Sequence, residues 1–187
     1  MVTFDRQATR DRLAGLDPAR LVAFAASCVQ RRESAVDTLA RHGRAEDQAV
    51  FQAALAETWA AALSGAPSEG DQLDGFAELN AEEEPSGALA FTADAIQALW
   101  YALKFRATGD REWVFHCASR CYDSAGFADV VSGGGFGFGA AEVRLQLEDL
   151  SELETSRLGP ELIARLVARS SRESERIRPH VTESGSG

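Results

Sequence analysis

Apolar residues recur three and four positions apart along most of this chain of 187 residues. That spacing places them on one face of an α-helix. Ala and Leu dominate these segments, and only five prolines interrupt them. We therefore predict an all-α fold, a single-domain bundle of six to eight helices over residues 1–181, followed by a disordered tail at 182–187. The length is sufficient for one continuous core.

Short local signals mark where the helices begin and end. Asp17 followed by Pro18 is typical of a helix start, and Gly65 is typical of a helix end. Residues 88–105 are apolar on almost every face and are predicted to form the central helix. An acidic loop at 66–87 and a Gly-rich linker at 132–139 separate the helices, and residues 140–156 and 160–178 form the last two.

The charge of the chain is concentrated in one segment. Of a net charge of -10, residues 66–99 carry eight acidic side chains and no Lys or Arg, whereas the flanking sequence is nearly neutral. A segment that carries charge of one sign tells more about the protein's binding partners than about its fold. A pI near 4.8 argues against binding to nucleic acid or to an anionic membrane, which both favour basic surfaces.

Cysteine usage and hydropathy bear on the compartment. Three cysteines in a chain of this size fit reduced thiols in a cytosol. The N-terminal residues lack the apolar stretch of a signal peptide. Asp94 and Lys104 interrupt the most apolar run, so we expect a buried helix there and no membrane span. The expected location is cytoplasmic.

Metal binding is considered at two places. Cys117 and Cys121 lie four residues apart with His116 beside them, and Cys28 could join them from another helix to hold Zn²⁺. Packing is the preferred interpretation, because His116 points away from Cys117 on a helical wheel and free cysteines are commonly buried. The acidic residues 82–84 lack the ligand spacing of a calcium loop. We expect neither a metal nor a cofactor.

The Gly-rich linker contains Gly135-x-Gly137-x-x-Ala140, a variant of the dinucleotide-binding fingerprint. That fingerprint requires a preceding strand, and residues 123–131 are predicted to be helical. A flexible hinge whose Phe136 and Phe138 pack against the bundle is preferred. A lid over a pocket is the alternative.

An enzyme is the alternative to a binding protein. Its site would join His116, Asp94 and Tyr101 or Tyr122 beneath the Gly-rich linker. A carboxylate in an apolar helix is costly to bury unless paired, so Asp94 either lies on a solvent-facing strip with Gln97 or pairs with an Arg such as Arg106 or Arg120. The structural role of Asp94 is preferred.

Several short elements resemble a known family. In chain order they are Leu13-x-x-Leu16, Phe24-Ala25, Trp59, an acidic loop, Ala93-Asp94-Ala95 with Leu99 and Leu103, and Glu142…Gln146-x-x-Asp149-Leu150. Together they resemble the YjaG-like family of small all-helical bacterial proteins of unknown function. The resemblance implies no catalytic residues. It also implies kinship with candidate immunity proteins of bacterial toxin systems. The Gly-rich segment is not part of it.

The preferred hypothesis is a non-catalytic protein whose acidic segment binds a basic protein partner, as an immunity-type toxin neutraliser would. Solubility alone is the competing explanation of the same charge. A homodimer is left open. The expected partner contacts are acidic residues with two apolar anchors among them: Glu69, Asp71, Asp74, Phe76, Glu78, Leu79, Glu82, Glu83 and Glu84.

Overall fold

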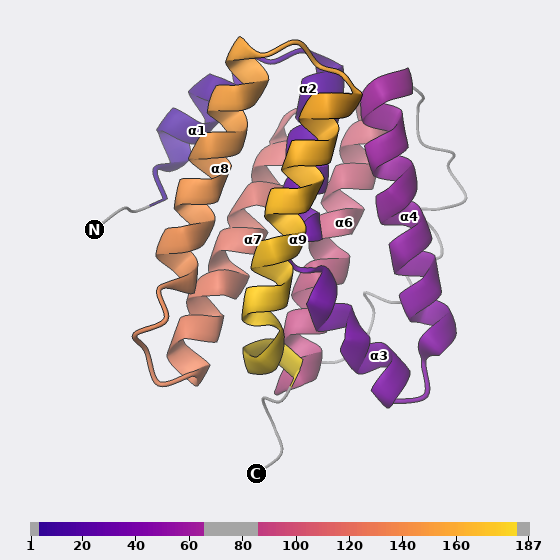
Figure 1. Ribbon diagram of the computed structural model, residues 1–187, viewed down its shortest axis with the longest axis vertical. Helices are drawn as coiled ribbons and strands as arrows, with labels where there is room; N and C mark the ends of the chain where they lie inside the picture. The colour runs from indigo at the N-terminus through magenta and orange to yellow at the C-terminus, as the bar shows by residue number, and fades with distance from the viewer. Residues whose placement is uncertain (1–3, 66–85, 183–187) are drawn as a thin grey trace.

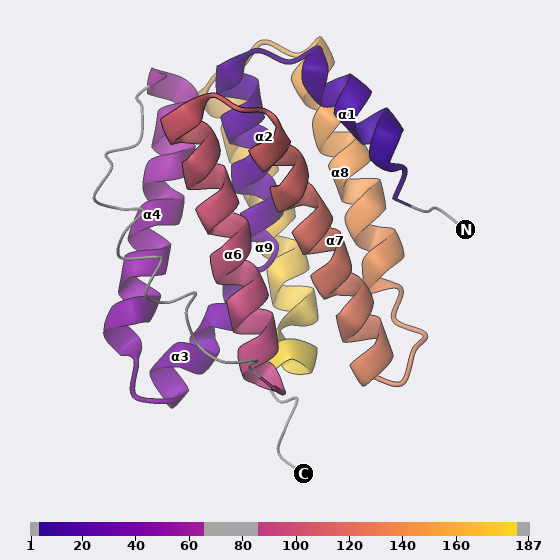
Figure 2. The same ribbon diagram turned by 180° about the vertical axis from the view of Figure 1, so that it is seen from behind.

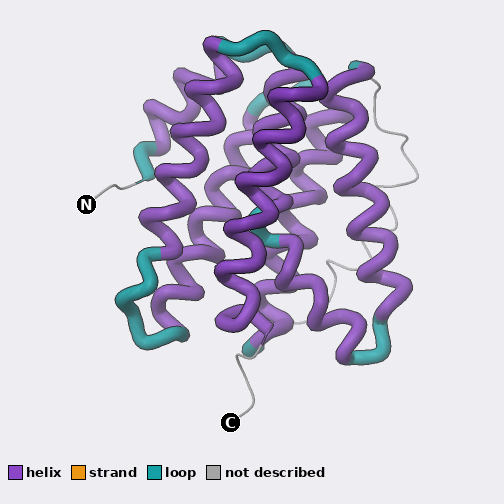
Figure 3. The backbone as a smooth tube through the Cα atoms, in the orientation of Figure 1, coloured by secondary structure: helices purple, strands orange, loops and turns teal. Residues whose placement is uncertain are grey.

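In the described residues, the backbone is helical except at short connections (Figure 3). The computed structural model describes residues 4–65 and 86–182, and these two ranges hold eight α-helices, one 3-10 helix and no strand. The predicted all-α bundle is therefore confirmed. The elements in chain order are α1 (Arg6–Ala14), α2 (Pro18–Gln30), η1 (Glu33–Val36), α3 (Asp37–Arg41), α4 (Ala45–Ser64), α6 (Ala88–Thr108), α7 (Glu112–Val131), α8 (Phe138–Thr155) and α9 (Pro160–Thr182).

Helix α2 lies at the centre of the bundle, between α8 and α9 on one side and α6 and α7 on the other (Figures 1 and 2). It contacts α4, α6, α7, α8 and α9, and every residue from Leu21 to Gln30 is buried. The prediction that residues 88–105 form the central helix is thus corrected, because α6 keeps a partly exposed strip through Asp94 and Lys104. Four of the residues 23–27 are Ala or Ser, so neighbouring helices can approach α2 closely from every side.

The helix boundaries follow the local signals. The Asp17 side chain accepts a hydrogen bond from the backbone N–H of Arg20, and Pro18 is the first residue of α2. Helices α4 and α6 end on Gly65 (φ +69°) and Gly109 (φ +73°), whose left-handed backbone favours glycine. Helix α1 was not predicted, although its N-cap Asp5 is a recognisable start signal.

The chain changes direction after α2. Arg31 and Arg32 follow the end of the helix, and the 3-10 helix η1 then leads into α3. The turn is fixed to α9, because the Ser34 backbone N–H donates to Ser174 Oγ (2.9 Å) and the Ser34 hydroxyl donates to the Ser174 carbonyl (2.8 Å). Both arginine side chains are consequently held inside the bundle, where they are 0% and 3% exposed.

Candidate functional site

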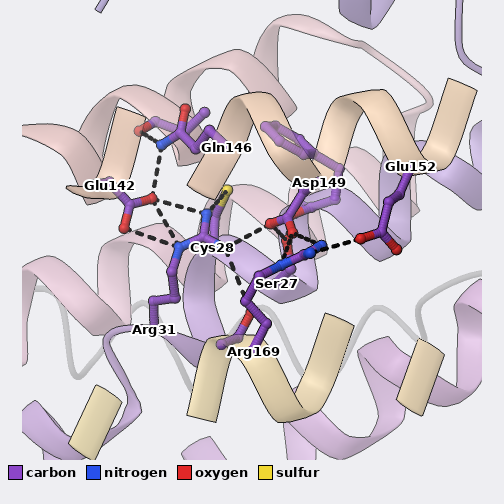
Figure 4. Close-up of polar contacts among 12 residues, drawn as sticks. Ser27, Cys28, Arg31, Glu142, Gln146, Asp149, Glu152 and Arg169 are labelled. Atoms are coloured by element: carbon purple, nitrogen blue, oxygen red, sulfur yellow. Dashed lines mark hydrogen bonds and ion pairs between the residues drawn. The ribbon is translucent and has the colours of Figure 1, made fainter. Parts of the chain in front are cut away.

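The largest concentration of buried charge lies where α2 ends against α8. Arg31, Glu142 and Asp149 have fully buried side chains, and Arg32 is 3% exposed. Figure 4 shows how Arg31 lies between Glu142 and Asp149. Arg31 donates to Glu142 from Nε and Nη2 (2.9–3.1 Å) and to Asp149 from Nη1 (2.6 Å). Arg32 Nη2 donates to the other oxygen of Glu142 (2.8 Å). We call these four residues the buried network.

Further polar groups complete the buried network from neighbouring helices (Figure 4). Asp149 accepts hydrogen bonds from Ser27 Oγ on α2 (2.7 Å) and from Arg169 on α9 (2.7 Å). Gln146 donates to Glu142 (2.9 Å) and to the carbonyl of Ala118 on α7 (3.0 Å). The buried network therefore joins α2, α7, α8 and α9.

The electrostatics keep Glu142 and Arg31 charged. Burial alone would raise the pKa of Glu142, but the adjacent Arg31 and Arg32 outweigh it and lower that pKa to about 2. Burial likewise opposes the charge of Arg31, yet Glu142 and Asp149 hold its pKa well above the usual value. An arginine and a carboxylate held in this way exchange no proton near neutral pH. The chemistry of the buried network is that of a fixed clamp between helices.

Sequence reasoning did not predict this clamp. Glu142, Gln146 and Asp149 are spaced i, i+4 and i+7, so they share one face of α8. All three are at most 2% exposed, and they served in the sequence analysis only as part of the family resemblance. Polar residues on one face of a helix otherwise packed into the core were the available signal.

The four residues of the alternative enzyme site are only partly brought together. The rings of Tyr101 and His116 lie 5.6 Å apart on α6 and α7, and His116 is exposed. Tyr122 stacks instead on Phe4, with ring centroids 5.1 Å apart. Three hollows lined by described residues, of about 180, 250 and 430 Å³, contain none of the four.

Asp94 forms the ion pair predicted for it. Its carboxylate accepts a hydrogen bond from Arg120 (3.2 Å), which is one of the two partners expected from the sequence. Burial nevertheless raises the pKa of Asp94, because Arg120 and Ser124 compensate for it incompletely. The contacts of Asp94 are therefore those of a structural ion pair between α6 and α7.

The Gly-rich connection runs between two helices. Helix α7 precedes it, so the strand that the dinucleotide fingerprint requires is replaced by a helix. At the start of α8, the Asp129 carboxylate accepts hydrogen bonds from the backbone N–H groups of Phe138 and Gly139 (2.9 Å each). A phosphate would have to displace this carboxylate. Phe138 is buried as expected, whereas Phe136 is 48% exposed, stacks on Phe138 and packs at a tilt against His180.

The cysteines are buried in the core. Cys28, Cys117 and Cys121 are each 0% exposed and carry free thiols. Burial raises the pKa of the Cys28 thiol well above its usual value. Across residues 4–65 and 86–182, no three His, Cys, Asp or Glu side chains are placed to share a metal ion. The geometry of the three cysteines is that of packing.

The acidic segment itself lies outside the described residues. This applies to Glu69, Asp71, Asp74, Phe76, Glu78, Leu79, Glu82, Glu83 and Glu84. The described residues on either side of it are Gly65, after α4, and Ser86, before α6. The end of α4 and the start of α6 lie at opposite ends of the bundle (Figure 2). None of the helices in the described part of the chain is both long and apolar enough to cross a membrane.

Comparison with known proteins identifies a shared fold. No family model and no curated protein matches the chain. Among solved structures, a DUF416 family protein from Shewanella baltica OS155 superposes with a TM-score of 0.70 at 16% sequence identity, over 87% of this chain and 92% of that one. The likeness extends to nearly the whole of both chains, and at this identity it establishes the fold alone.

Proposed function

We propose that this chain is a non-catalytic binding protein that engages a basic protein partner through its acidic segment, in the manner of an immunity protein that neutralises a toxin. The observation that carries the proposal is the distribution of charge. Residues 66–85 contain seven acidic residues and no Lys or Arg, whereas the rest of the chain has 22 acidic and 19 basic residues. The excess negative charge is therefore local.

Ion pairs within the bundle support this interpretation. The described helices satisfy many carboxylates with arginines of the same bundle, as in Arg10–Glu112, Arg12–Glu154, Arg120–Asp94, Arg169–Glu152 and Arg178–Glu175. The charge outside the acidic segment is in this way largely compensated, and residues 66–85 contain no basic residue of their own. A cationic surface would be attracted to that segment and would associate faster.

The proposed partner class follows from the same chemistry. Toxins that cleave nucleic acids present basic surfaces to the phosphate backbone, and a dense run of carboxylates can occupy such a surface instead. Phe76 and Leu79 would supply apolar contacts within the run. We also propose kinship with the YjaG-like family and a cytoplasmic location. The fold shared with a DUF416 protein supports the first.

A pull-down from the source organism tests the proposal. The wild-type protein should capture a basic protein at low salt, and capture should fall as salt rises because exposed charges are screened. Reversing Glu82, Glu83 and Glu84 to Lys should abolish capture. If the triple variant captures the same protein with the same salt dependence, the acidic segment serves solubility and the proposal is wrong.

A matched control separates a local field from net charge. Glu46, Glu148 and Glu161 are exposed and lie on α4, α8 and α9. Reversing these three to Lys changes the net charge by the same amount but leaves the acidic segment intact. Capture by this control variant should stay close to that of the wild type.

A further inference from the structure

A serine and a histidine meet where α7 and α9 finish, at the same end of the bundle (Figure 1). The hydroxyl oxygen of Ser132 lies 3.1 Å from Nδ1 of His180, although the two residues are 48 positions apart in the sequence. Both side chains are partly buried. A serine hydroxyl within hydrogen-bonding distance of an imidazole nitrogen is the arrangement from which nucleophilic serines react. We call these two residues the Ser–His pair.

The end of α7 fixes the backbone of Ser132. The N–H of Ser132 donates to the carbonyl of Ala128 (3.1 Å), and the N–H of Gly134 donates to the carbonyl of Asp129 (2.7 Å). Gly134 has the left-handed backbone that favours glycine (φ +79°). Residues 133–135 are all glycine, and a Cβ atom on any of them would meet nothing within 4 Å. The connection after Ser132 therefore has open space beside it.

Aromatic rings hold the imidazole of His180 in place. Its ring packs at a tilt against Phe136 (4.3 Å between centroids) and against Phe138 (5.0 Å). Arg176, one turn earlier on α9, lies over the Phe138 ring (4.5 Å) and donates to the carbonyl of Phe136 (3.4 Å). Glu173 compensates the charge of Arg176 (2.6 Å). These contacts fasten the Gly-rich connection to α9, so the Ser–His pair is held in its geometry before any reaction.

We propose that Ser132 is a modification site that accepts an acyl group from a small activated ester, with His180 as the base. In the tautomer whose Nδ1 carries no proton, the Ser132 hydroxyl donates to that nitrogen. The oxygen then attacks the carbonyl carbon of the ester, and its proton moves to Nδ1. The C–O bond of the donor breaks, and the leaving oxygen takes the bonding electron pair and the proton from Nδ1. The products are an acyl ester of Ser132 and a free alcohol.

The class of donor follows from the groups at the site. An activated ester fits because its leaving group departs readily after the serine attacks, whereas an amide requires stronger stabilisation of the oxyanion. The ring of Phe136, which is 48% exposed, offers an apolar surface to a small acyl chain. The inference goes beyond the proposed function and is independent of it. It concerns one acyl transfer per molecule without turnover, which is compatible with a binding protein.

Reaction of the full chain with p-nitrophenyl acetate tests the proposal. The absorbance of released p-nitrophenolate gives the total release, and intact mass with peptide mapping gives the number, the position and the rate of formation of acetyl groups. We expect one acetyl group per molecule, on Ser132, and none there in Ser132→Ala. His180→Phe keeps an aromatic ring against Phe136 and Phe138 but removes the base. It should slow acetylation of Ser132 at least about tenfold, since a positioned base contributes about 100-fold or more.

Matched variants remove the same residue types elsewhere. Ser151 is an exposed serine on α8 whose hydroxyl donates to a backbone carbonyl (2.9 Å). His42 is an exposed histidine at the end of α3. Ser151→Ala and His42→Gln should acetylate at Ser132 at the rate of the wild type. The circular dichroism spectra of all four variants should match that of the wild type, because each changed side chain is exposed or only partly buried.

Two results would overturn the proposal. If acetyl groups appear on Lys104, on the N-terminus or on several serines at rates equal to or above that of Ser132, then Ser132 has no special reactivity. If Ser132 is acetylated at the same rate in His180→Phe as in the wild type, then the imidazole is not the base. Either result leaves the proposed binding of a basic partner as it stands, because that proposal depends on the acidic segment alone.

Discussion

Replacing Glu142 by Gln removes one charge from the centre of the buried network and keeps the shape of the side chain. Glu142 is fully buried and accepts hydrogen bonds from Arg31, Arg32 and Gln146. In the variant, Arg31 retains Asp149, but the Arg32 guanidinium loses the carboxylate that faces it. The substitution therefore leaves positive charge buried without full compensation, which is among the most destabilising changes a core can undergo.

The expected loss follows from two separate considerations. The surrounding arginines lower the pKa of Glu142 from 4.5 to about 2. Since one pKa unit is worth about 1.4 kcal/mol, the fold favours the ionised form by about 3 kcal/mol. Removing one partner of a buried ion pair costs about 3–5 kcal/mol in other proteins. We expect Glu142→Gln to lower the free energy of unfolding at pH 7 by about 3–5 kcal/mol.

The loss should depend on pH in a defined direction. A carboxylate with a lowered pKa stabilises the fold above its unfolded pKa, near 4.5, and that stabilisation disappears as the pH falls toward 2. The wild type should therefore lose stability as the pH falls from 4.5 to 2. The difference in the free energy of unfolding between the wild type and Glu142→Gln should narrow over the same pH range. Urea unfolding, followed by far-ultraviolet circular dichroism, measures the free energy of unfolding of the wild type and of the variant at each pH.

A matched control is present on the same helix. Glu154 on α8 pairs with Arg12 at the surface (2.7 Å), where the two side chains are 36% and 26% exposed. Exposed pairs contribute little, so Glu154→Gln should cost less than about 1 kcal/mol. If Glu142→Gln costs no more than Glu154→Gln, or if its cost is the same at pH 3 as at pH 7, the clamp role of the buried network is refuted.

Two further substitutions test local features. Asp129→Ala removes the acceptor for two backbone N–H groups at the start of α8, so thermal unfolding should show a loss of about 1–2 kcal/mol. No loss would mean that water replaces the carboxylate. Asp94→Asn should be neutral or stabilising in neutral urea titrations, since burial raises the pKa of Asp94 and the ionised form is disfavoured in the fold. A marked loss of stability would show that the pair with Arg120 outweighs burial.

The fold was accessible from the sequence because its signals are local. Apolar spacing of three and four residues fixed the helical class, and the pairs Asp17-Pro18 and Ser64-Gly65 marked real helix ends. Helix boundaries that depend on packing against neighbouring helices were predicted less accurately. Helix α9 continues through Pro179 to Thr182, four residues beyond the predicted end at Arg178, because α9 packs against the rest of the bundle.

The arrangement of the helices and the buried network could not be predicted from local sequence signals. Helix α6 is the longer apolar helix, with 21 residues against 13, yet α2 is central, since small side chains at positions 23–27 let neighbouring helices approach it closely. Arg31 meets Glu142 across 111 residues of sequence. No local pattern encodes such a pairing, because it depends on how four helices pack together.

The rate of association between this protein and the captured basic partner, measured against salt concentration, tests the central claim most directly. Steering by the acidic segment predicts a rate that falls at least about tenfold between low and high salt. Reversing Glu82, Glu83 and Glu84 to Lys should remove that dependence. A rate that does not change with salt, and is the same in the reversed variant, would contradict the account.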